Sequence, residues 1–175
     1  MQAELKGNMP TTYTTCGTDL DALLNRTIAK SHPDLMECGA TFCLLFAKSS
    51  TEAPAISMHG YQTIAKVKKI GLKDRVAGLP DVMILIDEVY WQESQERRRA
   101  AIIDHCLFSL RVLRDKWNAI KEDDSGRPKM GIRKHDWHGG GFYEIARRHG
   151  LDAVEVRAIR SVLEKFQQMH LEFVD

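Results

Sequence analysis

The chain has 175 residues, of which 43% are apolar and 28% are charged. This is an ordinary composition for a protein with a buried core, so we expect a flexible N-terminal arm over residues 1–17 and a single domain over residues 18–175. The 25 basic and 24 acidic residues nearly cancel, which argues against a net field that would attract nucleic acid or a membrane. No apolar run approaches the length of a membrane span and residues 1–10 lack a signal-peptide core, so a cytoplasmic location is expected.

The spacing of apolar residues predicts a first helix that is capped by Thr18 and ends at His32, before Pro33. Its inward face consists of residues three or four positions apart: Leu20, Leu23, Leu24, Thr27 and Ile28.

Four later segments have the composition of β-strands. Residues 40–47 are apolar and aromatic, as in a buried strand. Residues 61–69 alternate in a way that predicts a half-buried strand. Residues 81–86 are the most apolar run and predict a central strand, and residues 130–134 predict a short one. A sheet of three or four strands, mostly antiparallel, follows from these segments.

Residues 91–117 are predicted to form one long central helix against which this sheet packs. Its buried face contains Ile102, Ile103, Leu107, Leu110 and Leu113. Two more helices are predicted over residues 142–149 and 152–170. The predicted fold class is therefore α+β, with a small sheet packed on a long central helix and further helices at both ends.

The long helix has a histidine at the position where a zinc peptidase has its first metal ligand. In the H-E-x-x-H motif, two histidines on one helical face bind zinc, and the glutamate between them activates a water molecule. His105 occupies the first histidine position, Cys106 the glutamate position and Ser109 the second histidine position. A thiol cannot replace the carboxylate base at the same geometry, and a neutral hydroxyl is a poor zinc ligand. Cys106 and Ser109 are thus degenerate positions, and we expect Cys106 to be buried and inert.

Two further histidines could form a different metal site. His135 and His138 bracket two residues, and with His105 they would supply three imidazoles for a metal such as zinc. The alternative is that His105 makes a local hydrogen bond on its helix and the other two are loop residues. The three glycines after His138 favour this alternative, so no cofactor is expected unless the residual histidines bind zinc.

The segments described above resemble the putative phage metallopeptidase family. Members have an apolar strand, a tryptophan, a helix with the sequence R-x-A-L-I-D-H-E-L-x-H and, later, an H-D motif before another helix. Residues 81–110 are similar to the first part, and His135 and Asp136, followed by residues 142–150, are similar to the second. The resemblance implies a zincin-like fold, in which His105 is the first zinc ligand and His135 a candidate third.

The resemblance also implies a function. Because the catalytic glutamate and the second histidine are replaced by Cys106 and Ser109, we expect a phage-encoded, zincin-like pseudoenzyme without catalytic residues. It would act in the host bacterial cytoplasm by binding a host protein, for example as an inhibitor of a host or defence factor. One alternative is an active metal-dependent hydrolase or peptidase with a rearranged site of His105, His135 and His138.

A second alternative is a nucleic-acid-binding accessory protein. Basic residues gather in two segments: Lys66, Lys68, Lys69, Lys73, Arg75, Arg97, Arg98 and Arg99. A solvated face with the acidic neighbours Glu93, Glu96 and Asp104 is the simpler explanation. No aromatic residues interleave with these charges, as they would in a platform for single-stranded nucleic acid.

Overall fold

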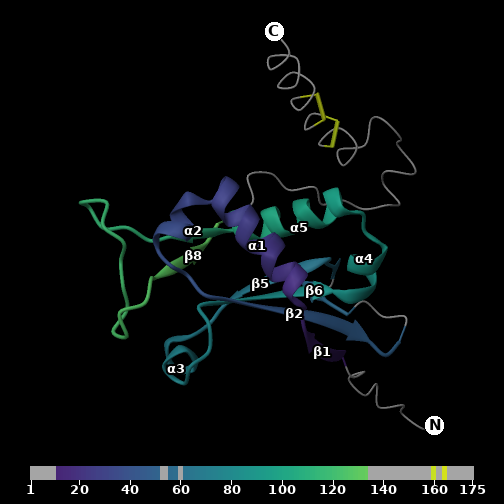
Figure 1. Ribbon diagram of the computed structural model, residues 1–175, viewed down its shortest axis with the longest axis horizontal. Helices are drawn as coiled ribbons and strands as arrows, with labels where there is room; N and C mark the ends of the chain where they lie inside the picture. The colour runs from purple at the N-terminus through teal and green to yellow at the C-terminus, as the bar shows by residue number, and fades with distance from the viewer. Residues whose placement is uncertain (1–10, 52–54, 59–60, 134–158, 161–162, 165–175) are drawn as a thin grey trace, which may run out of the picture. The chain divides into compact units, whose positions relative to one another are not determined.

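The computed structural model describes residues 11–51, 55–58, 61–133, 159–160 and 163–164 (Figure 1). The chain divides into two compact units, Met1–Lys134 and His135–Asp175, so the single domain predicted over residues 18–175 stays a prediction. The named helices are α1 (Thr18–Ser31), α2 (Pro33–Glu37), α3 (Leu72–Val76), α4 (Glu88–Glu93) and α5 (Glu96–Phe108). The named strands are β1 (Thr11–Thr15), β2 (Phe42–Ser49), β3 (Ser57–Met58), β4 (Tyr61–Gln62), β5 (Ala65–Lys69), β6 (Val82–Asp87), β7 (Leu110–Val112) and β8 (Met130–Ile132).

The main sheet has four strands in the order β1-β2-β6-β5. Its two outer pairs are antiparallel, whereas the central pair, β2 and β6, is parallel, with Phe42 opposite Val82 and Ala47 opposite Asp87. β2 and β6 can run parallel because the connection between them is long enough for the chain to return to the end of the sheet at which β2 begins. The α+β class is therefore confirmed, and the sheet is mixed. β3 pairs with β4 and β7 pairs with β8 in two separate antiparallel ribbons.

The core of the first unit lies between the sheet and a helical layer. α1, α2 and α5 lie on one side of the sheet and α3 on the other (Figure 1). Alternate residues of the central strands point toward the helices, because successive side chains of a strand face opposite sides. The core includes residues of α1, of the central strands and of the centre of α5: Leu20, Leu23, Leu24, Ile28, Leu44, Ile84, Ile86, Ile103 and Leu107. Of the face predicted for the first helix, Thr27 alone is absent from this core, and its hydroxyl donates to the Leu23 carbonyl at 2.8 Å.

The single long helix predicted over residues 91–117 is wrong. The chain forms two helices, α4 and α5, separated at Ser94, whose backbone is extended and whose hydroxyl donates to the Tyr90 carbonyl at 2.7 Å. α5 ends at Phe108, and the chain then enters β7, where Leu110 lies opposite Ile132. The apolar spacing after Phe108 fits a longer helix, but it also fits a helix that ends and is followed by a buried strand. Pairing of β7 with the distant strand β8 favours the second arrangement.

The other predicted elements differ from the structure mainly in their bounds. β1 lies within the predicted N-terminal arm, where Thr11 pairs with Ser49 at the edge of the sheet. Gly17 is the N-cap of α1, and Thr18 is its first helical residue rather than its cap. The strand predicted over residues 61–69 is divided into β4 and β5, and the one predicted over residues 130–134 is confirmed as β8. The helices predicted over residues 142–149 and 152–170 lie outside the described residues except at residues 159–160 and 163–164, which are helical. None of the helices in the described part of the chain is long and apolar enough to cross a membrane.

Candidate functional site

α5 places the two neighbouring residues of the degenerate motif in opposite environments. The His105 side chain is exposed, whereas Cys106 is 1% exposed beside Ile103 and Leu107, which are both fully buried. Adjacent residues of an α-helix point about 100° apart, so a helix whose core face includes Cys106 turns His105 outward. Cys106, which follows His105 where H-E-x-x-H would have its glutamate, therefore faces the core.

The chemistry of Cys106 follows from this burial. Removal from water penalises the thiolate and raises the pKa of the Cys106 thiol to about 12. The group is therefore neutral at pH 7, and a neutral thiol neither accepts a proton from water nor binds a metal well. Burial of this residue was expected from its apolar neighbours, and the structure confirms it.

We predict that Cys106 resists alkylation in the folded protein. Iodoacetamide at pH 8 should modify the half-buried Cys43 while leaving Cys106 unmodified. Both residues should react once the protein is unfolded in urea. Mass spectrometry of tryptic peptides distinguishes the two sites, and labelling of Cys106 as fast as Cys43 in the native protein would show that the thiol is accessible.

Ser109 has a structural role at the end of α5. Its backbone N–H donates to the His105 carbonyl at 3.1 Å, and its hydroxyl donates to the Cys106 carbonyl at 2.7 Å. Its own carbonyl accepts a hydrogen bond from the Arg133 N–H. These bonds satisfy backbone groups that the helix end leaves over, and they orient the hydroxyl toward the helix backbone.

A second histidine contacts α5, and the sequence pattern did not indicate this contact. His32, at the junction of α1 and α2, is 9% exposed, and its Nε2 lies 2.7 Å from Oδ1 of Asp104. Asp104 immediately precedes His105 on α5. The bond ties the helix junction to α5, and its two partners are too far apart in the chain for any local signal to connect them.

The proposed three-imidazole site can be examined only in part. His135 and His138 lie outside the described residues. Within the described ranges, no three or more His, Cys, Asp or Glu side chains are grouped closely enough to hold a metal. A zinc site needs at least three protein ligands, so His105 with Cys106 and Ser109 does not fit zinc without residues from elsewhere.

The predicted basic surface is not a single surface. Arg75 does not belong to it, because its side chain is buried, donates to Asp81 Oδ1 at 3.1 Å and to the Pro128 carbonyl at 3.2 Å, and forms an ion pair with Asp123. Lys69 Nζ donates to the Met130 carbonyl at 3.0 Å. A buried arginine requires such partners, and the sequence pattern gave no sign of them.

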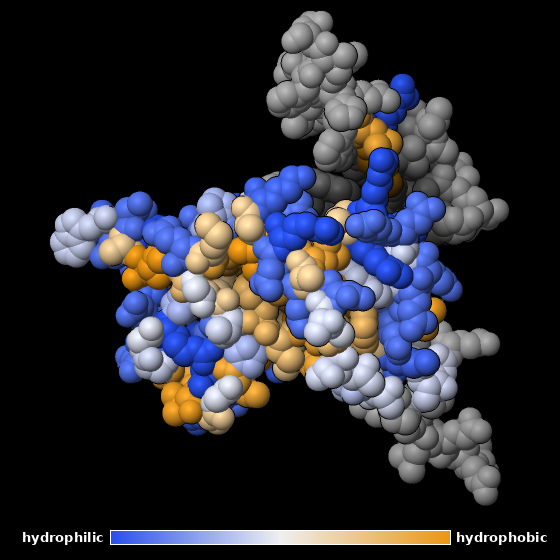
Figure 2. All heavy atoms as spheres, viewed as in Figure 1, coloured by the Kyte–Doolittle hydropathy of each residue, from blue (hydrophilic) through white to orange (hydrophobic). Residues whose placement is uncertain are grey.

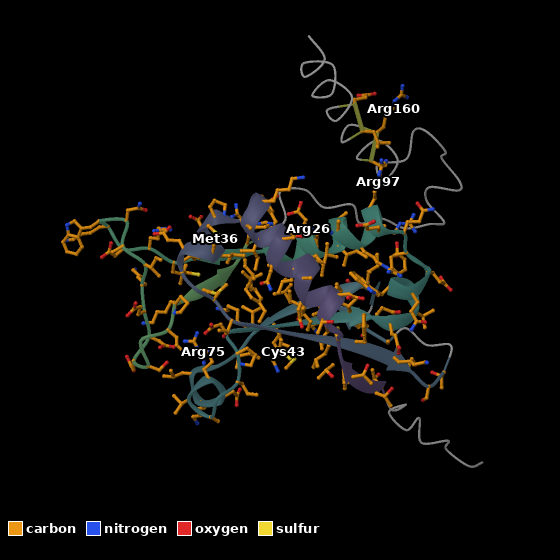
Figure 3. All side chains as sticks on the ribbon, in the orientation of Figure 1. Arg26, Met36, Cys43, Arg75, Arg97 and Arg160 are labelled. Atoms are coloured by element: carbon orange, nitrogen blue, oxygen red, sulfur yellow. The ribbon has the colours of Figure 1, made fainter. Side chains whose placement is uncertain are left out.

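The remaining basic residues are divided between the two sides of the sheet. Val67 packs against the core on the helix side, so its neighbours Lys66 and Lys68 face the other side. Arg97 lies at the start of α5, on the side of the sheet opposite Arg75 and α3 (Figure 3). Nucleic acid binding across one continuous basic face is therefore not supported.

Comparison with known proteins extends these observations. A family model described as "Putative phage metallopeptidase" matches residues 12–167. The chain belongs to this family. The match covers all the named helices and strands apart from the first residue of β1, and it includes the positions of His135 and His138. No curated protein and no solved structure matches the chain. The matched range includes α5 and the positions of Cys106 and Ser109 that follow His105.

Proposed function

We propose that this family member is a zincin-like pseudoenzyme that acts by binding a protein in the host cytoplasm. Inhibition of a host or defence factor is the kind of role we expect. The main support for the absence of catalysis is that Cys106, at the expected glutamate position, is 1% exposed and points into the core. A general base must reach the water that it activates, and no rotation of a core side chain provides this.

The zincin-like fold is part of the same proposal. Family membership supports it, as does the packing of the motif helix α5 against a mixed sheet. Such a protein keeps a stable scaffold while losing its reaction, so selection is expected to act on its surface rather than on its former active site.

Affinity purification from host cells tests the binding role. The tagged chain should co-purify with a host protein in a fixed ratio. A His105→Ala variant should retain that host protein, because the proposed contact does not use the degenerate motif on α5. Loss of the partner in His105→Ala, or on addition of a chelator, would place binding at a metal site instead. Absence of any stoichiometric host protein would contradict the binding role.

Family membership favours one alternative, an active metal-dependent hydrolase that uses His105, His135 and His138. Elemental analysis of the chain purified without chelator distinguishes the pseudoenzyme from the active hydrolase. The pseudoenzyme proposal expects zinc well below one equivalent, whereas the alternative expects about one zinc per chain, bound through all three imidazoles. His138→Ala is the matched variant, because it should abolish stoichiometric zinc only if the rearranged site exists.

A further inference from the structure

The connection between β7 and β8 makes two turns, the first closed by a bridge between Arg114 and Ile120 and the second by a bridge between Glu122 and Pro128. The first turn presents one tryptophan to solvent. Trp117 is 76% exposed, more than any other large apolar side chain in the described part of the chain. The first turn projects from the side of the first unit (Figures 1 and 2), whereas the second turn packs against the rest of the first unit through the ion pairs of Asp123 with Arg75 and of Arg127 with Asp81. An indole that is 76% exposed leaves a large apolar area in contact with water, and burial of that area in a complex would be favourable.

The turn that bears Trp117 is held in one conformation. Oδ1 of Asp115 accepts hydrogen bonds from the backbone N–H of Trp117 at 2.8 Å and of Ala119 at 2.9 Å. The Asp115 N–H donates in turn to the Ala119 carbonyl at 2.9 Å. Asn118 takes a left-handed conformation, with φ of 68°, which asparagine tolerates better than most residues. The turn is therefore ordered by hydrogen bonds within the turn itself, from its backbone and from the Asp115 carboxylate.

The base of the turn is fixed to the helical layer. Arg114 donates to the Asn118 carbonyl at 3.0 Å and to the carboxylates of Glu37 at 2.6 Å and Asp34 at 3.2 Å on α2. Arg114 also forms a β-bridge with Ile120 across the turn. An anchor that is ordered before binding loses less conformational entropy when the complex forms, and tryptophan loses little because it has only two side-chain torsions.

The charges around Trp117 indicate the kind of partner. Lys116 Nζ lies 4.1 Å from the centre of the Trp117 ring, so an ammonium group covers one face of the indole. The exposed charged residues of positions 116–125 balance, with Lys116 and Lys121 against Glu122 and Asp124. A nucleic-acid contact would need an excess of cations along a phosphate backbone. A protein pocket needs none, and tryptophan is among the residues most enriched in the energetic centres of protein interfaces.

We propose that Trp117 is the anchor through which this chain binds its partner, a protein with an apolar pocket and a carboxylate at the rim of that pocket. The pocket receives the indole, and the carboxylate pairs with Lys116. This inference rests on the proposed binding role and adds the surface that carries it out, which is separate from the degenerate motif on α5.

Site-specific photocrosslinking in the host cells of the phage tests the anchor. The full chain is expressed with p-benzoylphenylalanine in place of Trp117 and, as a matched control, in place of Val76, which is 69% exposed on α3. After irradiation, position 117 should form an adduct with one host protein that position 76 does not form. An adduct of position 117 with nucleic acid or with a second copy of the chain overturns the inference, as does its failure to form any adduct.

The adducted host protein, purified separately, then serves as the probe for affinity. Trp117→Ala should raise the Kd by about 30-fold or more, as expected for a central anchor. Asp115→Ala keeps the indole but frees the turn, and it should raise the Kd by a smaller factor that Asp115→Asn partly restores. Val76→Ala should leave the Kd unchanged. An unchanged Kd for Trp117→Ala overturns the inference.

Different results would contradict the binding role and the Trp117 anchor. If the unmodified chain retains a host protein while position 117 forms no adduct, the anchor is wrong and the binding role stands. If no host protein binds the unmodified chain either, both are wrong.

Discussion

Replacing Cys106 with glutamate is expected to lower the free energy of unfolding by about 3–5 kcal/mol, although the change produces the first two residues of an H-E-x-x-H motif. Cys106 is 1% exposed and packs in the core beside Ile103 and Leu107, so a carboxylate there would be buried without a partner. Urea unfolding at pH 7, followed by circular dichroism, measures the loss. The deficit should shrink toward pH 4, because burial raises the pKa of the new carboxyl group and its protonated form is less costly to bury.

The matched control is Ala101→Glu, which places the same side chain on the exposed face of α5. Its effect should stay within about 0.5 kcal/mol, as for most surface substitutions. If Cys106→Glu were as stable as Ala101→Glu, the position would be accessible and the helix face that we assign to the core would be wrong. The pseudoenzyme proposal would then lose its main support.

Replacing Asp81 with alanine is expected to cost about 3–5 kcal/mol, because it leaves two arginines without their shared carboxylate. Asp81 is 3% exposed and accepts hydrogen bonds from the backbone N–H and the hydroxyl of Thr41, each at 2.8 Å. The Asp81 carboxylate also pairs with Arg75 at 3.1 Å and with Arg127 at 2.9 Å. This network holds the start of β6 to α3 and to the second of the two turns between β7 and β8. Urea unfolding at pH 7 again measures the loss.

The dependence of this loss on pH follows from the pKa of Asp81. Burial alone would raise that pKa, but hydrogen bonds from Thr41 and the charge of Arg127 outweigh it and hold the value below the ordinary 3.8. Asp81 therefore stabilises the fold above its unfolded pKa, and this contribution is lost as the pH falls through its folded pKa. The difference between wild type and Asp81→Ala should narrow at pH 3. Asp74→Ala, an exposed carboxylate on α3, is the control and should change stability little at either pH.

The parts of the fold that the sequence predicted are those with strong local patterns. The apolar spacing of Leu20, Leu24 and Ile28 defines α1, and the continuous apolar runs define β2 and β6. The end of α5 could not be predicted, because the position of Leu110 relative to the preceding apolar residues fits a continued helix as well as a strand. The deciding interaction is its pairing with Ile132 in β8, which is remote in the chain.

The same distinction applies to the candidate site. The burial of Cys106 could be predicted, since it lies between apolar residues on a periodic helix. The contact of His32 with Asp104 and the burial of Arg75 could not, because each depends on partners brought together only by the tertiary fold. Trp117 also escaped prediction, because helical spacing placed it at the end of a helix, whereas the chain forms a hairpin there.

The most direct measurement for the central proposal is metal-dependent hydrolysis by the purified chain. Cleavage of a denatured protein substrate is followed with added zinc, with chelator, and with the His105→Ala variant under the same conditions. We predict no cleavage above background in any of the three, because the glutamate position is occupied by a buried thiol. Zinc-stimulated cleavage that chelator abolishes and His105→Ala lacks would contradict the proposal and establish an active enzyme.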